Sequence, residues 1–296
     1  MPRIVVTGAA GGTGASIVTG LHDCGCDVVP TDLRPWTPES PPGYVQLDLR
    51  DAAGVNDLLA GADGLVHFGS PPADSMYSTT EAFHHVAVAG FNLFQAAANT
   101  GVTRVAWASS IEVYGNLTRH PSLPVTEQSP LSPPGIYGSS KLLLERLAID
   151  FSTWHNIAFA GFRLARIIYD NPNGRTKLHR LATDPAMGAD CLWAYVDARD
   201  VATACLAWLE SERPGAEVFN LAAANIHLEA DTPVLLQEHG YGHLAAPHLE
   251  TADSTPFSTS RVREMLGWNE RYDWRESLQT FDPNDPSPPK PDTPYS

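Results

Sequence analysis

The feature that most restricts the fold of this chain is a glycine-rich turn between a short apolar run and a helical segment. The turn reads Thr7-Gly8-Ala9-Ala10-Gly11-Gly12-Thr13-Gly14 and directly follows the β-branched run of residues 3–7. Glycines at 8, 11 and 14 permit a tight turn, close approach of the backbone to a ligand, and close packing of helix on strand. Helix N-terminal amides then face an anionic group, here expected to be the pyrophosphate of a dinucleotide. No Lys-Ser/Thr pair follows the turn, which excludes a P-loop.

Apolar runs and helical stretches alternate through the first half of the chain. The runs lie at 27–31, 63–68, 102–108 and 157–164, and the helical stretches at 12–23, 51–60, 79–99 and 137–155. Such alternation predicts an α/β fold with a Rossmann-type, doubly wound parallel sheet.

The alternation weakens after about residue 165. Residues 170–192 and 225–281 are richer in Asn, Pro, Gly and His, whereas a helix at 198–210 and a strand at 217–221 are expected to rejoin the sheet. We therefore expect a dinucleotide-binding domain at 1–165, with 197–224 returning to it. A small C-terminal substrate domain would comprise 166–196 and 225–282. The Pro-rich segment 283–296 is expected to be a mobile tail.

Asp32 ends the second apolar run, where a carboxylate accepts both ribose hydroxyls of NAD and repels the 2′-phosphate of NADP. Arg34 would partly offset that repulsion, but the pattern favours NAD. Asp48 and Leu49 follow a third short strand and are placed to meet the adenine. The alternative for Asp48 is a helix N-cap.

Tyr137-Gly138-Ser139-Ser140-Lys141 places a phenol and an ammonium four residues apart, on one face of a helix. A free phenol titrates near pH 10, and a nearby cation lowers its pKa by roughly 1–3 units, toward that of a useful base. The alternative is an ordinary amphipathic helix face. Ser110 favours catalysis, because it lies near the carboxyl end of the strand at 102–108, where parallel sheets bind ligands.

Together these motifs resemble the extended short-chain dehydrogenase/reductase family. The likeness includes the glycine turn, the segment Ser109 to Gly115, Tyr-Gly-Ser-Ser-Lys and the later run Tyr195 to Ala202, and it covers about residues 3–280 in consistent order. It implies an NAD cofactor, a catalytic triad of Ser110, Tyr137 and Lys141, and a helix-bundle homodimer. The predicted cofactor contacts are Gly8, Gly11, Gly12, Thr13, Gly14, Asp32, Asp48, Leu49, Phe68, Gly69, Ser109, Tyr137 and Lys141.

Family membership leaves dehydrogenase, epimerase and dehydratase open. Sugar-nucleotide dehydratases carry an Asp-Glu pair after the catalytic hydroxyl, whereas this chain has Ile111-Glu112. Nucleotide-sugar epimerases usually have an Asn where this chain has Arg166, and they are mostly longer. The dehydratase is disfavoured, and a nucleotide-sugar 4-epimerase is kept as the alternative.

The chain is most similar to uronate and aldose dehydrogenases, which oxidise a free sugar at C1. The likeness lies in residues 7–12, 67–69, 108–110 and 163–175, with Arg175 where uronate dehydrogenases place the arginine that holds the substrate carboxylate. The alternative for Arg175 is a solvated loop charge. Ile111 and Arg166 depart from the pattern, which leaves room for a substrate of different shape. The predicted substrate contacts are Ser70, Ser110, Ile111, Tyr137, Arg166 and Arg175.

Charge and composition limit the other partners. There are 19 basic and 34 acidic residues, and the net charge of −15 repels nucleic acid and anionic membranes. The N-terminal residues enter a strand without an apolar leader, so we expect a cytoplasmic protein. The histidines and four cysteines lack metal-site spacing, so no metal is expected. A non-catalytic dinucleotide sensor is the competing class, although sensors of this fold typically lose the tyrosine or the lysine.

Overall fold

Seven parallel strands form the central sheet of the computed structural model, which describes residues 1–71, 77–244 and 251–279. The strand order β3-β2-β1-β4-β5-β6-β9 reverses direction between β1 and β4, which places a ligand crevice at their carboxyl ends. The expected doubly wound sheet is therefore confirmed. The strands are β1 (Arg3–Thr7), β2 (Asp27–Asp32), β3 (Val45–Gln46), β4 (Gly64–His67), β5 (Arg104–Ser110), β6 (Ala158–Leu164) and β9 (Ala216–Leu221).

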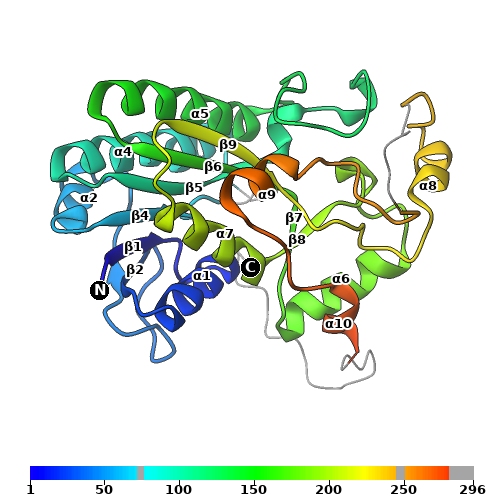
Figure 1. The fold of residues 1–296 in the computed structure, drawn as a ribbon. Coiled ribbons are helices and arrows are strands. Elements are labelled where there is room, and N and C mark those ends of the chain that lie inside the picture. Colours follow the sequence, from blue (N-terminus) through cyan, green and yellow to red (C-terminus); the bar gives the residue numbers. More distant parts are fainter. Residues whose placement is uncertain (72–76, 245–250, 280–296) are drawn as a thin grey trace.

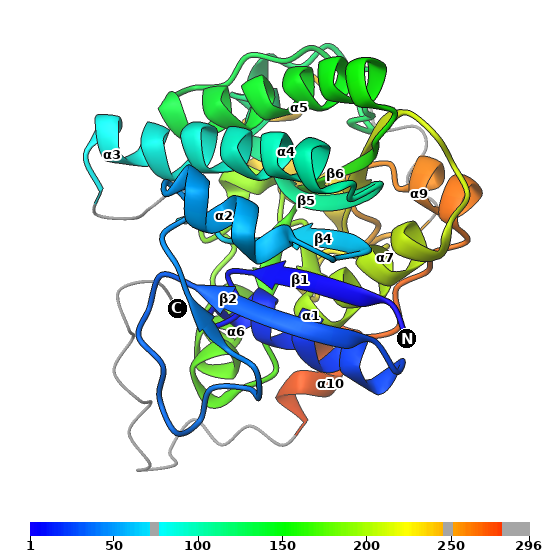
Figure 2. The same cartoon turned by 90° about the vertical axis from the view of Figure 1, so that its left-hand side faces the viewer.

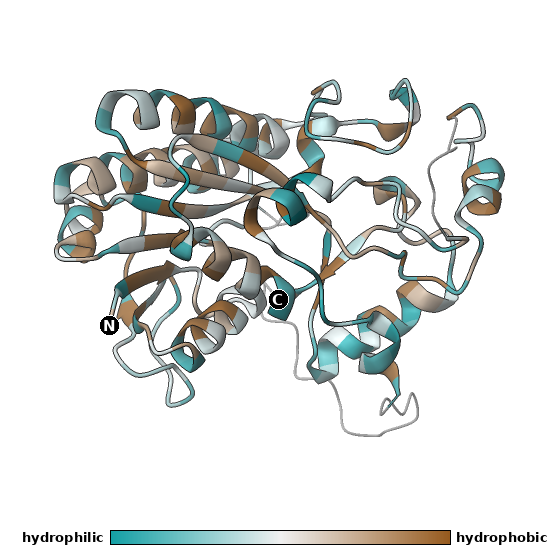
Figure 3. Ribbon diagram, viewed as in Figure 1, coloured by the Kyte–Doolittle hydropathy of each residue, from teal (hydrophilic) through white to brown (hydrophobic). Residues whose placement is uncertain are grey.

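Helices cover both faces of the sheet, as the two perpendicular views show (Figures 1 and 2). One face carries α1 (Gly12–Asp23) and α7 (Ala198–Glu210), and the other carries α2 (Ala52–Leu59), α4 (Ala89–Thr100) and α5 (Ile136–His155). Side chains of a strand alternate between these layers: Ile4 and Val6 join the α1 and α7 core, whereas Val5 joins the other. Apolar residues accordingly follow the strands (Figure 3).

The helical stretch expected at 79–99 contains an irregularity that periodicity did not predict. It consists of α3 (Thr79–Phe83), a π-helical turn η1 (His84–Val88) and α4. A π-helical turn inside a longer helix is rare and often lies beside a functional site. Here it carries His85 to the edge of the cleft described below.

Residues after Leu164 form a second layer beyond the carboxyl edge of the sheet. β7 (Arg166–Ile168) and β8 (Tyr195–Asp197) pair in parallel, with α6 (Pro172–Thr183) and the 3-10 turn η4 (Ala189–Cys191) between them. The shorter helices are α8 (Thr232–Glu238), α9 (Ser260–Leu266) and α10 (Trp274–Leu278). The expected helix at 198–210 and strand at 217–221 return to the main fold as α7 and β9.

The predicted division into two domains stays a prediction, although a separate apolar cluster around Trp193 and Ile226 lies in the second layer. The segment 283–296, expected as a tail, lies outside the described residues. Within the described parts of the chain, every helix is too short or too polar to cross a membrane.

Candidate active site

The glycine turn brings the end of β1 against the end of β4. Gly8 has a φ of 77°, which favours glycine, and a Cβ there would lie 2.4 Å from the carbonyl oxygen of Phe68. A Cβ on Gly14 would lie 2.0 Å from the carbonyl oxygen of Gly8. Both positions therefore require glycine for close backbone packing, and the N-terminus of α1 points its amides at the space above the turn.

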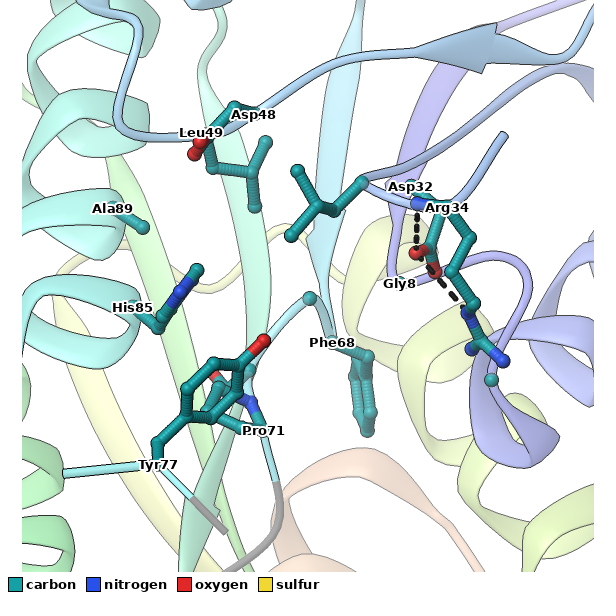
Figure 4. A pocket seen from close by; sticks show the side chains of 14 residues that line it. Gly8, Asp32, Arg34, Asp48, Leu49, Phe68, Pro71, Tyr77, His85 and Ala89 are labelled. Atoms are coloured by element: carbon teal, nitrogen blue, oxygen red, sulfur yellow. Dashed lines mark hydrogen bonds and ion pairs between the residues drawn. The ribbon is translucent and has the colours of Figure 1, made fainter. Parts of the chain in front are cut away.

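A cleft opens beside this turn at the carboxyl edge of the sheet (Figure 4). Its lining includes seven of the thirteen predicted cofactor contacts, whereas Gly12, Thr13 and Gly14 belong to the first turn of α1, and Ser109, Tyr137 and Lys141 lie outside the lining. The lining residues that the sequence did not predict are Leu33, Pro71, Tyr77, His85 and Ala89. The lining is Gly8, Gly11, Asp32, Leu33, Arg34, Asp48, Leu49, Phe68, Gly69, Ser70, Pro71, Tyr77, His85 and Ala89.

Asp32 stands at the end of β2 with its carboxylate in the cleft. Its Oδ1 accepts from the backbone N–H of Arg34 at 3.0 Å and from the Arg34 Nε at 3.4 Å, and its Oδ2 accepts from Ala10 at 3.1 Å (Figure 4). The carboxylate is thus fixed for two ribose hydroxyls while the guanidinium lies alongside. Together the glycine turn and this carboxylate fit an NAD molecule.

Asp48 also lines the cleft, and its predicted alternative role as a helix cap is wrong. Asp51 caps α2 by accepting from the backbone amides of Ala53 and Gly54. The carboxylate of Asp48 instead accepts from both Nε and Nη2 of Arg50, with the shortest contact at 2.6 Å. This hydrogen bonding lowers the pKa of Asp48. The side chain is therefore anionic where the cleft opens.

Tyr169 is a cofactor-side residue that the sequence did not reveal. Its hydroxyl lies 3.1 Å from the Thr13 Oγ1, and a Cβ on Gly12 would lie 2.6 Å from its ring. Tyr169 follows β7 and is 156 residues from Thr13 in the chain. It packs the second layer against the first turn of α1. Patterns of neighbouring residues in the sequence do not predict a contact between residues so far apart in the chain.

Lys141 is fully buried in α5 and oriented by two acceptors. Its Nζ donates to the carbonyl oxygen of Ala108 at 2.7 Å and to the Ser70 Oγ at 3.1 Å. Burial lowers the pKa of Lys141 to about 7. Ser70, which was predicted to contact substrate, therefore lies between the cleft and the lysine. The carboxyl ends of β4 and β5 and the helix α5 thus meet at this amino group.

Tyr137 lies one turn before Lys141, and the lysine Nζ is 5.4 Å from the centre of its ring. The first turn of α5 packs against the 3-10 turn η2 (Ile111–Tyr114), since a Cβ on Gly138 would be 3.0 Å from the carbonyl oxygen of Glu112. Ser110 immediately precedes η2, and its Oγ accepts from the Glu112 amide at 3.1 Å. Its own O–H remains a donor for a substrate oxygen. The structure thus brings the three predicted catalytic residues to the same end of β5 and α5.

Below this group lies a buried polar network that sequence reasoning missed. The carboxylate of Glu145 accepts from the Arg163 Nη2 at 2.7 Å and Nε at 2.9 Å, and from the Ser109 hydroxyl at 2.6 Å. The Arg163 Nη1 also donates to the Tyr114 hydroxyl, which donates in turn to the Asn220 Oδ1 at 2.5 Å. Ser109, predicted as a cofactor contact, thus directs its hydroxyl into this network. The network joins α5, β5, β6 and β9 one turn beyond the lysine.

His67 lies close to the lysine and is uncharged. Its Nδ1 is 2.8 Å from the Thr7 Oγ1, and that oxygen accepts from the Gly69 amide at 3.2 Å. Burial lowers the pKa of His67 to about 3, and the charge of Lys141 adds to this effect. At neutral pH the histidine therefore adds no second charge beside Lys141.

The two predicted substrate arginines lie in the second layer. Arg166 begins β7, and its Nη2 donates to the Asp190 Oδ1 at 3.2 Å. Arg175 lies in the first turn of α6, and its Nε donates to the Asp170 Oδ1 at 2.8 Å. Ile111 begins η2 and packs partly buried against the apolar cluster around Trp193. Ser110 and Ile111 are adjacent, so a substrate that contacts one also approaches the other.

The sequence profile of the "NAD dependent epimerase/dehydratase family" matches residues 4–222. The chain belongs to this family. NAD is accordingly its cofactor, in agreement with the cleft and the carboxylate of Asp32. The resemblance drawn from the motifs is confirmed, and the family members that it resembles are enzymes that act on sugars.

Individual relatives include both of the reactions considered above. The UDP-glucose 4-epimerase of Azospirillum brasilense is 24% identical over 92% of this chain and 88% of its own length. The uronate dehydrogenase of Pseudomonas putida is 29% identical over 55% of this chain and 60% of its own length. The crystal structure of uronate dehydrogenase from Agrobacterium tumefaciens superimposes with a TM-score of 0.68 at 25% identity, covering 97% of this chain and 92% of that one. These likenesses support an NAD-dependent, sugar-modifying enzyme.

Proposed function

We propose that this protein is an NAD-dependent dehydrogenase that oxidises a hydroxyl of a small sugar or sugar acid. The observation that carries the proposal is the fully buried Lys141 beside the Tyr137 ring, with its Nζ hydrogen-bonded to Ser70, a lining residue of the cleft suited to NAD. A buried cation next to a phenol favours the phenolate. Uronate dehydrogenases among the relatives support the choice of substrate.

In the proposed reaction, Tyr137 removes the proton of the reacting hydroxyl while the Ser110 hydroxyl holds the oxygen. Bound NAD⁺ supplies the hydride acceptor. Lys141 stabilises the phenolate electrostatically, and Ala108 and Ser70 hold the ammonium in place through the two hydrogen bonds described above. The cofactor contacts named from the sequence remain part of this proposal.

A nucleotide-sugar 4-epimerase is the second candidate. Its support is the coverage of the Azospirillum brasilense enzyme, which aligns with 92% of this chain. Arg166 weakens this reading, because it stands where epimerases usually have an asparagine. The dehydrogenase is therefore preferred.

The test is to incubate the protein with NAD⁺ and a panel of free aldoses and sugar acids and to follow NADH absorbance. Stoichiometric NADH formation with a free sugar is expected. UDP-sugars are added in parallel and analysed by chromatography for the 4-epimer. Epimer formation without net NADH would replace the dehydrogenase by the epimerase. Full NAD binding without any turnover would favour the sensor.

We further propose a homodimer through α4 and α5, as the family resemblance implies. Both helices expose large apolar side chains: Phe91 is 42% exposed, Leu143 is 41% exposed and Trp154 is 63% exposed. An unpaired apolar face of this kind is typical of subunit contacts. Light scattering coupled to gel filtration should give twice the chain mass of 31.9 kDa. A monomer at micromolar concentration would contradict the dimer.

A further inference from the structure

Arg166 lies close to the catalytic group. In the sheet register Ser110 pairs with Leu164, and Arg166 is two residues further along the same chain direction. Beyond Leu164 the chain leaves the main sheet, and Ala165 belongs to the same apolar cluster as Ile111, the residue after Ser110. Arg166 therefore directly follows a residue that packs in the cluster beside the serine.

The guanidinium of Arg166 is incompletely satisfied by protein. Its Nη2 donates to Asp190 and the guanidinium also interacts with the Cys191 side chain, while its Nε is buried and has no hydrogen-bond partner in the described part of the chain. The Asp190 side chain is 77% exposed, so the ion pair is accessible to water and its loss costs little free energy. A carboxylate from a ligand would offer two acceptor oxygens to the fork of donors.

Arg175, by contrast, belongs to a chain of ion pairs. Its partner Asp170 also accepts from the Arg199 Nη1 at 2.8 Å, and Arg199 in turn holds Asp197 by two contacts of 2.8 Å. The Asp170 side chain is 26% exposed. A ligand carboxylate at Arg175 would have to displace an acid that two arginines fix.

The turn that presents Asp190 is held in a strained conformation. Leu192 and Trp193 both have positive φ, 52° and 56°, although neither is glycine and both are fully buried. The Trp193 Nε1 donates to Pro185 at 2.7 Å and the Tyr241 hydroxyl donates to Ala189 at 2.7 Å, which holds the turn on both sides. Residues held in such conformations often belong to functional segments.

Of the two neighbouring residues Arg166 and His227, only Arg166 carries a positive charge at neutral pH. The ring of His227 packs against Gly188, where a Cβ would lie 2.6 Å from its Nε2. Burial lowers the pKa of His227 to about 4, and the charge of Arg166 contributes to the lowering. At neutral pH the histidine is uncharged and makes no ion pair of its own with an anionic ligand.

We infer that Arg166, and not Arg175, binds the anionic group of the substrate, and that the substrate is a sugar acid whose carboxylate displaces Asp190. This inference rests on the proposed dehydrogenase function. It assigns recognition of the carboxylate to the start of β7 and not to α6. Asp190 then occupies the position of the substrate carboxylate and keeps the Arg166 guanidinium oriented until the sugar acid binds.

The experiment compares kcat/KM at saturating NAD⁺ for D-galacturonate and D-galactose, and for D-glucuronate and D-glucose. The native enzyme should prefer the acids. Arg166→Met should lower the acid-to-neutral ratio by about 10- to 100-fold, the value of a charge-assisted hydrogen-bond pair. Arg166→Lys should keep part of the preference. Asp190→Asn should raise kcat/KM for the acids by about two- to fivefold, because an uncharged asparagine competes less well with the substrate carboxylate for Arg166.

Arg180→Met, on the exposed face of α6, is the matched control for the loss of one positive charge and should leave the ratio within twofold. The inference is overturned if Arg166→Met leaves the ratio unchanged, if Arg175→Met removes it instead, or if the native enzyme uses neutral sugars equally well. Conversion of UDP-sugars that depends on Arg166 would assign the arginine to a diphosphate and also overturn it.

A binding measurement separates this inference from the proposed function. If no sugar is oxidised, the dehydrogenase proposal fails, and calorimetric titration of D-galacturonate into the NADH-loaded protein still decides the role of Arg166. Binding that is lost in Arg166→Met and kept in Arg180→Met supports the inference. Absence of binding to the native protein, or equal binding to both variants, contradicts it. Urea unfolding of each variant checks that the fold is intact.

Discussion

Lys141 donates a hydrogen bond of 2.7 Å to the carbonyl oxygen of Ala108, two residues before Ser110, the proposed catalytic serine. This contact ties the helix that carries Tyr137 to the strand that carries the serine. It also holds an ammonium in a site from which water is excluded, where burial lowers its pKa to about 7. The same contact thus aligns the catalytic groups and makes the lysine responsive to pH.

The burial of Lys141 predicts a pH-dependent stability. Because the folded-state pKa lies below the unfolded value, the unfolded chain binds more protons between about pH 7 and 10. The free energy of unfolding of the native protein should therefore rise with pH relative to Lys141→Met, by on the order of 2 kcal/mol between pH 7 and 9. Urea unfolding at three pH values measures this, with the exposed Lys177→Met as control. Parallel curves for native protein and Lys141→Met would contradict a buried ammonium.

Ser70→Ala should reduce kcat about 5- to 10-fold with little change in KM, because Lys141 loses an acceptor worth roughly 1 kcal/mol. Ser70→Thr should restore most of kcat. A rise in KM at unchanged kcat would instead make Ser70 a substrate contact, as the sequence predicted. Steady-state kinetics at saturating NAD⁺ distinguish the two results.

Two ion pairs that involve α5, a buried one with Arg163 on β6 and an exposed one within the helix, should differ in their energetic importance. Glu145→Gln leaves the buried Arg163 with a weaker partner and should cost about 3 kcal/mol or more of unfolding free energy. Asp150→Asn breaks the exposed pair with Arg146 and should cost less than about 1 kcal/mol. Urea unfolding measures both. Equal losses would show that the buried network is not a special support of the site.

Asp32→Ala should change the choice of cofactor. Removing the carboxylate deletes the ribose acceptor and frees Arg34 for a 2′-phosphate, so the ratio of kcat/KM for NADP⁺ over NAD⁺ should rise about 10-fold or more. The additional change Arg34→Ala should cancel the gain with NADP⁺. An unchanged ratio in Asp32→Ala would mean that the carboxylate does not meet the ribose.

Local sequence patterns predicted the nucleotide-binding half because each of its elements carries its own signal. The run Ile4 to Val6, the glycines at 8 and 14 and the four-residue spacing of Tyr137 and Lys141 are all properties of adjacent residues. The strands and helices expected from them agree with the structure to within a few residues. The family profile then confirmed the family and the NAD cofactor that the combined motifs implied.

The remainder depends on contacts between distant segments. Tyr169 meets Thr13 across 156 residues, and Arg163 meets Glu145 only because β6 lies beneath α5. α6 was not expected as a helix, since its Pro, Asn and Gly residues suggest a loop, although Asn171 and Pro172 in fact cap and start it. Arg166 likewise pairs with Asp190 because the turn after α6 returns the chain to the start of β7, which the sequence does not predict.

The central claim is that the Tyr137 hydroxyl transfers the proton in the oxidation of the sugar. The most direct measurement is kcat of Tyr137→Phe with NAD⁺ and the best sugar of the panel. The dissociation constant for NAD⁺ is measured in parallel, and Tyr272→Phe, at a half-buried tyrosine, is the control. We predict a loss of turnover of about 10³-fold or more in Tyr137→Phe, with NAD⁺ affinity within a few-fold of native and no loss in the control. Turnover of Tyr137→Phe within tenfold of the native enzyme would contradict the claim.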